Sequence, residues 1–467
     1  MPEDSGGKPL PPGRAAISGA AASGPAASGA AGAPPAAGML PPALFPDAQV
    51  QDARIPDARI PDALFPAALP LLPRLRLSAC RRPAAGAPET EGEWLDVVVL
   101  PGGATALVIG SAAAPAGQAG AAAARLRAGL RDSLRGGAAP AEALARLDAA
   151  AGGSPGGRGA TACLAVLNPL TGELRYAAAG QPAPVICPPA GNGWRPGPVR
   201  GSPGDGPDAG RPEAGTAVLP PGAVMLLYSG PARLPDEDRP DRSSADRDSA
   251  DRDSAAGAAR RVADTASSIL RDADSAPAAD TADRVVPAVL AGLTGDGHAG
   301  SATVLAAHRL PAPVGGWSMN MPGDPVALRE LRSRLRDWLR ELGASPSDRT
   351  DVELAVWEAA VNAVVHGRPA KGAARVTVHA ALDEAGRAVI QVSDRGRWRP
   401  PGPLEPGRRW PGGQGLLVIR QAADELDIAP GLDGTTVTVR RSLSRPVPGQ
   451  PQPAEHPATA ARSGTPA

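Results

Sequence analysis

The feature that most constrains the fold is an apolar stretch from Glu353 to His366 that carries polar residues at regular intervals. Glu358, Asn362 and His366 are spaced four residues apart, so a helix places them on one face. Such a stripe usually marks a solvated surface, but here Ala, Val and Trp flank it. The pattern therefore predicts a helix over residues 349–366 whose carboxylate, carboxamide and imidazole converge on one ligand.

The surrounding sequence predicts a layered domain around this helix. Leucines at helical spacing indicate a second helix over residues 324–342, and a third helix is expected after glycines at 415–423. Apolar runs predict strands at 374–382, 388–393, 426–429 and 435–440. Helices packed on one mixed sheet would form an α/β sandwich over residues 316–442.

Three later motifs add chemistry to that domain. An apolar strand ends at Asp394 and is followed by Gly396, so a carboxylate could accept a hydrogen bond from an adenine amino group. Gly413 and Gly415 precede a helix, where free N–H groups favour phosphate. Thr435 then opens a strand. Each motif is weak by itself, but together they favour a nucleotide site.

The order of these motifs resembles the GHKL ATPase/kinase superfamily, most closely the RsbW-type anti-sigma serine kinases. The resemblance implies ATP and Mg²⁺ as cofactors, with Glu358 as general base and Asn362 holding Mg²⁺. It implies a STAS-type anti-sigma antagonist, a sigma factor or both as partners, and it allows a homodimer. The remaining cofactor-binding positions that it implies are His366, Asp394, Gly396, Gly413, Gly415 and Thr435.

The region 62–310 alternates strands and helices. Strands are predicted at 95–100, 104–109, 160–167, 173–178, 224–228 and 301–307, and helices at 119–134, 140–151, 258–270 and 282–293. The segments Glu91–Val97, Leu174–Pro182 and Leu226–Gly230 resemble SpoIIE-type members of the PPM metal-dependent phosphatases. The resemblance implies a PPM-type β-sandwich flanked by helices.

The metal-binding aspartates of that family are mostly absent here. Glu93 and Asp96 remain as a vestigial metal site, whereas Ser111, Gly230 and Gly300-Ser301 stand at the other aspartate positions. Hard cations need several oxygen ligands, so Mn²⁺ or Mg²⁺ and phosphatase activity are not expected in this domain. An active enzyme would need substitute ligands from residues 236–253, a run of Asp, Arg and Ser that is typical of a solvated insertion.

The glycine and proline content predicts which parts of the chain are disordered. The chain has 57 glycines and 56 prolines, and residues 1–61 and 443–467 are predicted to be disordered. A proline at every fifth position of residues 52–66 excludes a regular helix there.

Lys plus Arg equals Asp plus Glu at 48 each, which argues against nucleic acid or anionic membranes as partners. No apolar run approaches the roughly 20 residues of a membrane span, so a cytoplasmic protein is expected.

These features predict a cytoplasmic partner-switching regulator with a C-terminal serine kinase and a degenerate phosphatase-like domain. Two alternatives remain open from the sequence. One is an active metal-dependent phosphatase with an ATP-binding appendage, and the other is a nucleotide-sensing scaffold without catalysis.

Overall fold

The computed structural model describes residues 64–83, 92–112, 114, 118–152, 159–189, 214–229, 244–271, 281–294, 301–366, 375–396, 414–431 and 434–447. These residues all belong to one compact unit, Arg59–Ala467. The low-complexity segment and the part of the proline repeat before Leu64 lie outside the described residues.

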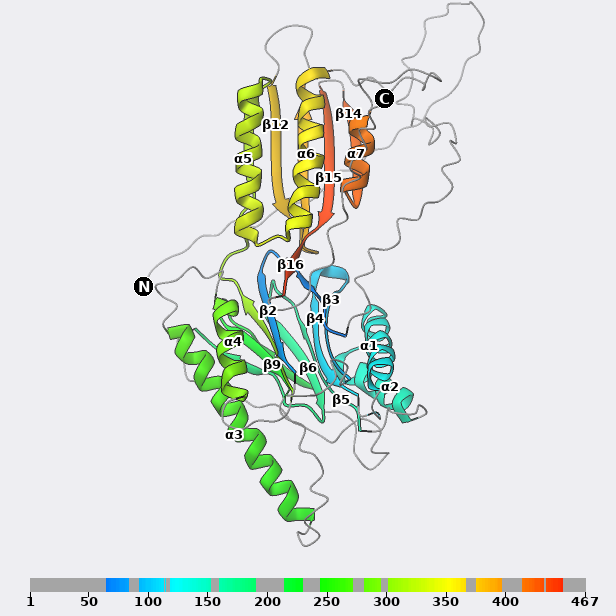
Figure 1. Ribbon diagram of the computed structural model, residues 1–467, viewed down its shortest axis with the longest axis vertical. Coiled ribbons are helices and arrows are strands. Elements are labelled where there is room, and N and C mark those ends of the chain that lie inside the picture. The colour runs from blue at the N-terminus through cyan, green and yellow to red at the C-terminus, as the bar shows by residue number, and fades with distance from the viewer. Residues whose placement is uncertain are drawn as a thin grey trace, which may run out of the picture. The chain divides into compact units, whose positions relative to one another are not determined.

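Two antiparallel sheets form the first domain, which we call the sandwich domain (Figure 1). One sheet has the order β2 (Leu75–Arg82), β10 (Ala302–Arg309), β9 (Val224–Tyr228) and β7 (Val185–Cys187). The other has the order β3 (Glu93–Val99), β4 (Thr105–Ser111), β5 (Thr161–Leu167), β6 (Glu173–Ala179) and β8 (Gly215–Val218). Helices α1 (Ala119–Arg135) and α2 (Pro140–Gly152) follow β4, and α3 (Ser244–Arg271) and α4 (Thr281–Leu293) precede β10.

Alternation along the strands builds the core between the two sheets. Successive side chains on a strand point to opposite faces, so every second residue enters the core. Leu75, Leu77 and Ala79 of β2 meet Leu95 of β3 in this way. The outer face of the β3 sheet packs on α1 and α2, and the outer face of the β2 sheet packs on α3 and α4. The prediction of a β-sandwich flanked by helices is therefore confirmed.

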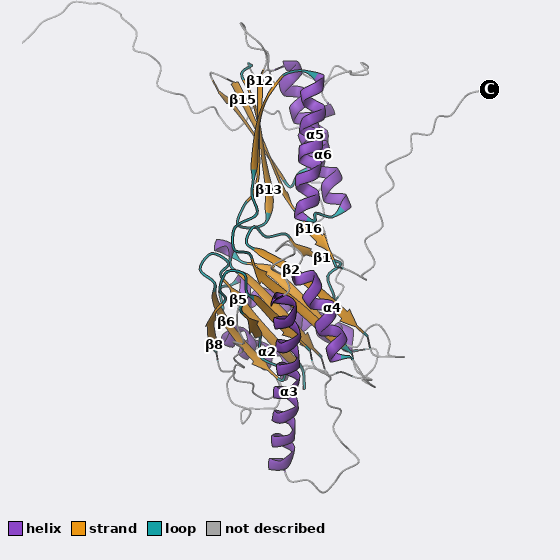
Figure 2. Ribbon diagram, turned by 90° about the vertical axis from the view of Figure 1, so that its left-hand side faces the viewer, coloured by secondary structure: helices purple, strands orange, loops and turns teal. Residues whose placement is uncertain are grey.

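The C-terminal domain has one sheet covered by helices on one face (Figure 2). Its strand order is β11 (Trp317–Pro322), β12 (Arg375–Leu382), β13 (Arg387–Asp394), β15 (Gly434–Ser442) and β14 (Glu425–Gly431). The helices are α5 (Pro325–Leu342), α6 (Pro346–His366) and α7 (Gln414–Ala422). All the neighbouring strands run antiparallel, so the predicted α/β sandwich is confirmed but its mixed sheet is not.

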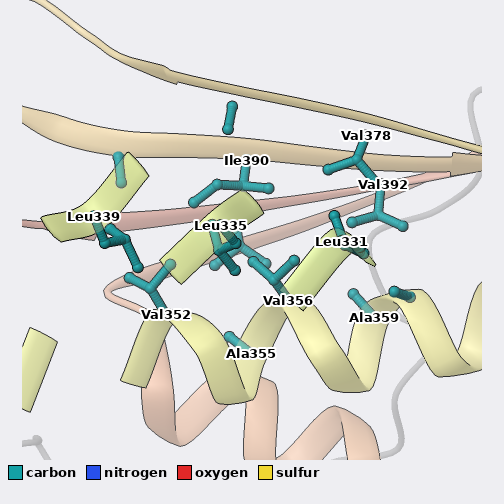
Figure 3. Close-up of a cluster of buried hydrophobic side chains, with 14 of the residues drawn as sticks. Leu331, Leu335, Leu339, Val352, Ala355, Val356, Ala359, Val378, Ile390 and Val392 are labelled. Atoms are coloured by element: carbon teal, nitrogen blue, oxygen red, sulfur yellow. The ribbon is translucent and has the colours of Figure 1, made fainter. Parts of the chain in front are cut away.

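Local sequence signals fix the ends of α5. The Asp324 carboxylate accepts hydrogen bonds from the Val326 and Ala327 amides, both at 2.9 Å, and so caps the first turn. Gly343 ends the helix in a left-handed conformation with φ of 76°. Between these caps, Leu331, Leu335 and Leu339 pack against α6 and the sheet (Figure 3).

One sequence prediction needs correction and another stays a prediction. Residues 236–253 were expected to form a solvated insertion; α3 begins at Ser244 within that run, and the side chains of the run lie outside the described part of the chain. The tail was expected to be disordered from residue 443, yet β16 (Ser444–Pro446) pairs with β1 (Ala68–Pro70). Both strands are too short for a periodic signal, so the sequence did not predict them. Within the described residues, no helix is both long and apolar enough to span a bilayer.

Candidate functional site

The predicted polar stripe on α6 faces the start of α7. A Cβ atom added at Gly415 would lie 2.9 Å from Oε2 of Glu358 and 3.3 Å from Nδ2 of Asn362. A larger residue would therefore displace these two side chains, and glycine lets the first turn of α7 approach them. Glu358 and Asn362 are half-buried, and within the described residues Glu358 makes no ion pair. The structure thus brings together a carboxylate, a carboxamide and a helix N-terminus.

The strand ends of β13 and β15 form a second group. Asp394 lies opposite Thr435 in the sheet, and its carboxylate accepts a hydrogen bond of 2.7 Å from the Gly396 amide. Burial raises the pKa of the Asp394 carboxyl, while hydrogen bonds from the Gly396 and Thr435 amides work against that rise. A Cβ atom at Gly434 would lie only 1.8 Å from the Asp394 carbonyl oxygen, so the turn requires glycine. Asp394, Gly396 and Thr435 therefore form one compact corner.

Two of the predicted site residues lie partly or wholly outside the described residues. His366 is the last residue of α6, and its side chain lies outside the described part of the chain. Gly413 directly precedes α7 and also lies outside it. Their roles stay predictions.

A groove of about 520 Å³ lies between α5 and α6, and Glu358 and Asn362 are not among its lining residues. Glu353 binds Arg336 through two hydrogen bonds of 3.1 and 2.9 Å. Burial alone would raise the pKa of the Glu353 carboxyl, but Arg336 and Arg332 outweigh it and hold that pKa below its usual range. These pairs organise the surface of α5 and α6, and the nucleotide motifs lie elsewhere.

In the sandwich domain, Glu93 lies at one end of the core between the sheets. It continues the inward-facing row of Leu95 on β3, and Arg81 continues the row of Leu77 and Ala79 on β2. The Glu93 carboxylate contacts Nε of Arg81 at 3.3 Å. It also accepts hydrogen bonds from the hydroxyls of Ser229, at 3.3 Å, and Thr303, at 3.1 Å.

Asp96 lies on the other face of the same strand. Trp94 and Val98 share that face and pack against α1 and α2, because they alternate with Glu93 and Leu95. The Asp96 carboxylate accepts two hydrogen bonds from Arg131 of α1, at 2.9 and 2.5 Å, and lies 3.9 Å from Nε of Arg127. The vestigial metal site is therefore split, since Glu93 and Asp96 point to opposite faces of β3.

The residues that the structure describes in the sandwich domain do not fit a dinuclear metal centre. Within the described ranges, no three His, Cys, Asp or Glu side chains lie close enough to hold a metal ion. Ser111 pairs with Glu93 across the sheet and offers a hydroxyl at a position where the resemblance to PPM phosphatases implies a carboxylate. Gly230 and Gly300 lie outside the described residues. Each remaining carboxylate is paired with a guanidinium instead.

Sequence reasoning missed the partners of both carboxylates. Arg81 could have been noticed, because it continues the alternation of Leu75, Leu77 and Ala79 and so had to face the core. Thr303 lies opposite Arg81 in the ladder of β10 and β2, which no local pattern reveals. Arg131 lies on a helix that is distant in sequence from Asp96. These contacts depend on the tertiary fold.

The three cysteines are free thiols. Cys163 and Cys187 are buried at 0% and 1% exposure and pack as small apolar residues. Burial raises the pKa of Cys163 to about 12 and that of Cys187 to about 11, so both thiols stay protonated and unreactive at neutral pH. Cys80 is half-buried.

Comparison with known families agrees with the two domains. Residues 101–309 match the family model of stage II sporulation protein E (SpoIIE). Residues 321–441 match the histidine kinase-like ATPase domain. The matches therefore place a SpoIIE-type, PPM phosphatase-like domain before a histidine kinase-like (GHKL) ATPase domain, in the order that the motifs predicted.

Three solved structures are similar to all or part of this chain. The RsbU and RsbW domains of Rv1364c from Mycobacterium tuberculosis are 29% identical, with a TM-score of 0.62 over 81% of this chain and 98% of that one. The phosphatase and partial regulatory domain of SpoIIE from Bacillus subtilis matches at 14% identity, covering 50% of this chain and 63% of that one, with a TM-score of 0.36. The SiaA-PP2C domain of Pseudomonas aeruginosa matches at 15% identity, covering 50% and 86%, with a TM-score of 0.35.

Proposed function

We propose that the C-terminal domain binds ATP-Mg²⁺ and transfers the γ-phosphoryl group to a serine hydroxyl of a partner protein. The observation that carries this proposal is the convergence of Glu358 and Asn362 on Gly415 at the start of α7. A helix N-terminus favours phosphate oxygens, and glycine leaves space for them beside the carboxylate and the amide. The site thus combines the anion-binding N-terminus of α7 with a carboxylate base, Glu358, and a neutral amide oxygen, from Asn362.

Glu358 would act as the general base. As the bond between the serine oxygen and the γ-phosphorus forms, its carboxylate takes the hydroxyl proton, and the bond from phosphorus to the β-phosphate oxygen breaks to release ADP. Arginines neutralise the carboxylates of the sandwich domain, but within the described residues Glu358 has no such cation. It therefore stays available to accept a proton.

The other predicted residues would hold the nucleotide. Asn362 would supply an amide oxygen to Mg²⁺, and the ion when bound would offset the charge of the phosphates. Asp394 would accept a hydrogen bond from the adenine amino group, with Gly396 and Thr435 beside it. His366 and Gly413 complete the proposed set, at the end of α6 and just before α7.

The sandwich domain is proposed to be catalytically inactive. Activation of water by a PPM phosphatase requires two cations between carboxylates. Here Arg81 neutralises Glu93, and Arg131 with Arg127 neutralises Asp96, on opposite faces of β3. Charge neutralisation by arginine supports a domain that keeps the PPM fold without its metal ions.

The proposed partners are a STAS-type anti-sigma antagonist, a sigma factor or both. The likeness to the paired RsbU and RsbW domains of Rv1364c supports such a partner-switching role. In that role the protein would act in the cytoplasm, and a homodimer is compatible with it.

The test is a phosphorylation assay with purified full-length protein, a recombinant STAS-domain protein from the same genome and γ-labelled ATP. We expect label on a serine of the STAS protein, in a reaction that needs Mg²⁺. Binding of ATP without transfer to any STAS protein of that genome would support the nucleotide-sensing scaffold. Release of phosphate from a phosphorylated STAS protein, dependent on Mn²⁺, would support an active phosphatase instead.

A further inference from the structure

The helix that carries Glu358 and Asn362 begins on strand β16. Ser345 donates its amide hydrogen to the Ser444 carbonyl oxygen at 2.8 Å. The Asp348 carboxylate accepts hydrogen bonds from the amide and the hydroxyl of Ser444, at 2.8 and 2.7 Å. The Ser345 hydroxyl accepts a hydrogen bond from the Asp348 amide and donates one to the Asp348 carboxylate, so the first turn of α6 and β16 form one hydrogen-bonded unit.

Strand β16, which follows β15 in the chain, also packs against the sandwich domain. It pairs with β1 (Figure 2). Val447, directly after it, is 4% exposed in the core between the two sheets of the sandwich. Leu71, directly after β1, does the reverse, because it is 5% exposed in the core of the C-terminal domain. Each domain therefore buries a side chain in the core of the other.

Two arginines strengthen this junction. Arg76 of β2 is buried and donates hydrogen bonds to the carbonyl oxygens of Leu342, at 2.6 Å, and Glu341, at 3.5 Å. These carbonyls end α5, where the helix dipole favours a cation. Arg445 of β16 forms an ion pair with Asp283 in the first turn of α4. The turn between α5 and α6 is thus held by groups of the sandwich domain.

We infer that Arg76 and Arg445 are positioning residues for the nucleotide site. Together with β1, β16 and Asp283 they form what we call the clasp, through which the sandwich domain sets the position of α6. This inference rests on the proposed binding of ATP-Mg²⁺ by Glu358, Asn362 and Gly415. Asp348 and Asn362 are 14 residues apart on one continuous helix, about 21 Å along its axis, so a shift at the clasp is carried to the site.

The clasp gives an inactive phosphatase-like domain a role in the kinase. Asp283 lies at the start of α4, whose buried face packs on the β2 sheet together with α3. A protein that binds the sandwich domain and moves α4 would strengthen or weaken the ion pair between Asp283 and Arg445. The consequence is a change in the affinity of the other domain for nucleotide.

A charge exchange across the clasp tests this inference in the full-length chain. The variants are Arg445→Asp, Asp283→Arg and the two combined, with Arg445→Gln as a milder change. The measurements are ATP-Mg²⁺ affinity by calorimetry and the number of thermal unfolding transitions with and without ATP-Mg²⁺. Arg146→Asp, which breaks an exposed pair with Glu142 inside α2, is the matched control.

We expect each single change to weaken ATP-Mg²⁺ binding about five- to tenfold and to separate the unfolding of the two domains. ATP-Mg²⁺ should then stabilise only one of the two transitions, and the combined exchange should restore both wild-type affinity and joint unfolding. If the clasp only joined the two domains, ATP-Mg²⁺ affinity would not fall in the single variants, and the combined exchange would have no loss of affinity to restore.

Wild-type affinity and a single transition in all of the variants would overturn the inference. Weakened binding that the combined exchange fails to restore would also overturn it. If the wild-type chain binds no ATP-Mg²⁺, the proposed function fails, and the number of transitions alone decides whether the clasp joins the domains.

Discussion

The two domains treat their carboxylates in opposite ways. In the sandwich domain, Glu93 and Asp96 are each less than a tenth exposed and each meet an arginine. In the C-terminal domain, Glu358 faces a glycine at a helix N-terminus and is only half-buried. A buried carboxylate needs a compensating cation, and when a guanidinium provides it the carboxylate becomes structural. The comparison shows that arginines compensate the buried carboxylates of the sandwich domain, whereas the Glu358 carboxylate faces a helix N-terminus.

The largest expected effect is on the C-terminal side of this comparison. Glu358→Gln keeps the shape of the side chain but removes the base, so phosphoryl transfer should fall by about 10²- to 10⁴-fold. ATP-Mg²⁺ affinity should change only a few-fold. Initial rates of transfer to the STAS protein and calorimetric binding measure the two quantities. Glu353→Gln, on another face of the same helix, is the control and should transfer at nearly the wild-type rate.

The next effect concerns the arginine pairs of the sandwich domain. Arg81→Met leaves the Glu93 carboxylate buried without its cation and should lower the free energy of unfolding by about 3–5 kcal/mol. Chemical denaturation followed by circular dichroism measures this loss. Adding Glu93→Gln removes the buried charge and should recover most of it. An unchanged stability in Arg81→Met would show that Arg81 does not neutralise Glu93.

A smaller effect is expected at the start of α7. The Cβ of Gly415→Ala would lie 2.9 Å from the Glu358 carboxylate and must displace it, so ATP-Mg²⁺ affinity should fall about tenfold, or about 1.4 kcal/mol. Gly129→Ala on α1 is the matched control, because nothing lies within 4 Å of its added Cβ. It should leave affinity unchanged and stabilise the helix slightly. If Gly415→Ala and Gly129→Ala bind ATP-Mg²⁺ with equal affinity, the phosphates do not bind beside Gly415.

The smallest effect is a pH dependence from Asp394. Its raised pKa means that the folded protein holds this proton more tightly than the unfolded chain does. Its contribution to stability therefore becomes less favourable as the pH rises, whereas adenine binding needs the ionised form. As the pH is lowered, ATP affinity should therefore begin to fall at a higher pH than it would with an aspartate of ordinary pKa. Asp394→Asn should remove this pH dependence. The check is calorimetric binding over a series of acidic buffers.

Much of the C-terminal domain could be predicted from the sequence. The leucine period predicted a helix over 324–342, and α5 covers Pro325–Leu342 because Asp324 and Gly343 cap it. The spacing of Glu358 and Asn362 also predicted their common face, since a helix of 3.6 residues per turn leaves no other arrangement. Asp394 and Thr435 were named one by one, and the antiparallel pairing of β13 with β15 brings them together.

The sequence was less informative where contacts are long-range. Glu93 and Asp96 were grouped because both stand at aspartate positions of the family that the sequence resembles, but a strand separates residues at odd spacing onto opposite faces. The clasp was missed because β1 and β16 have three residues each and come from the two ends of the described chain. Their pairing depends on the folded domains and leaves no periodic signal.

The central claim is that this chain adds phosphate to its partner and does not remove it. The most direct measurement follows one labelled serine of the STAS protein with the full-length wild type and Glu358→Gln, first in ATP-Mg²⁺ and then in Mn²⁺ after ATP is removed. We predict label with the wild type, almost none with Glu358→Gln, and no loss of label in Mn²⁺. Equal labelling by both proteins, or release of the label in Mn²⁺, would contradict the claim.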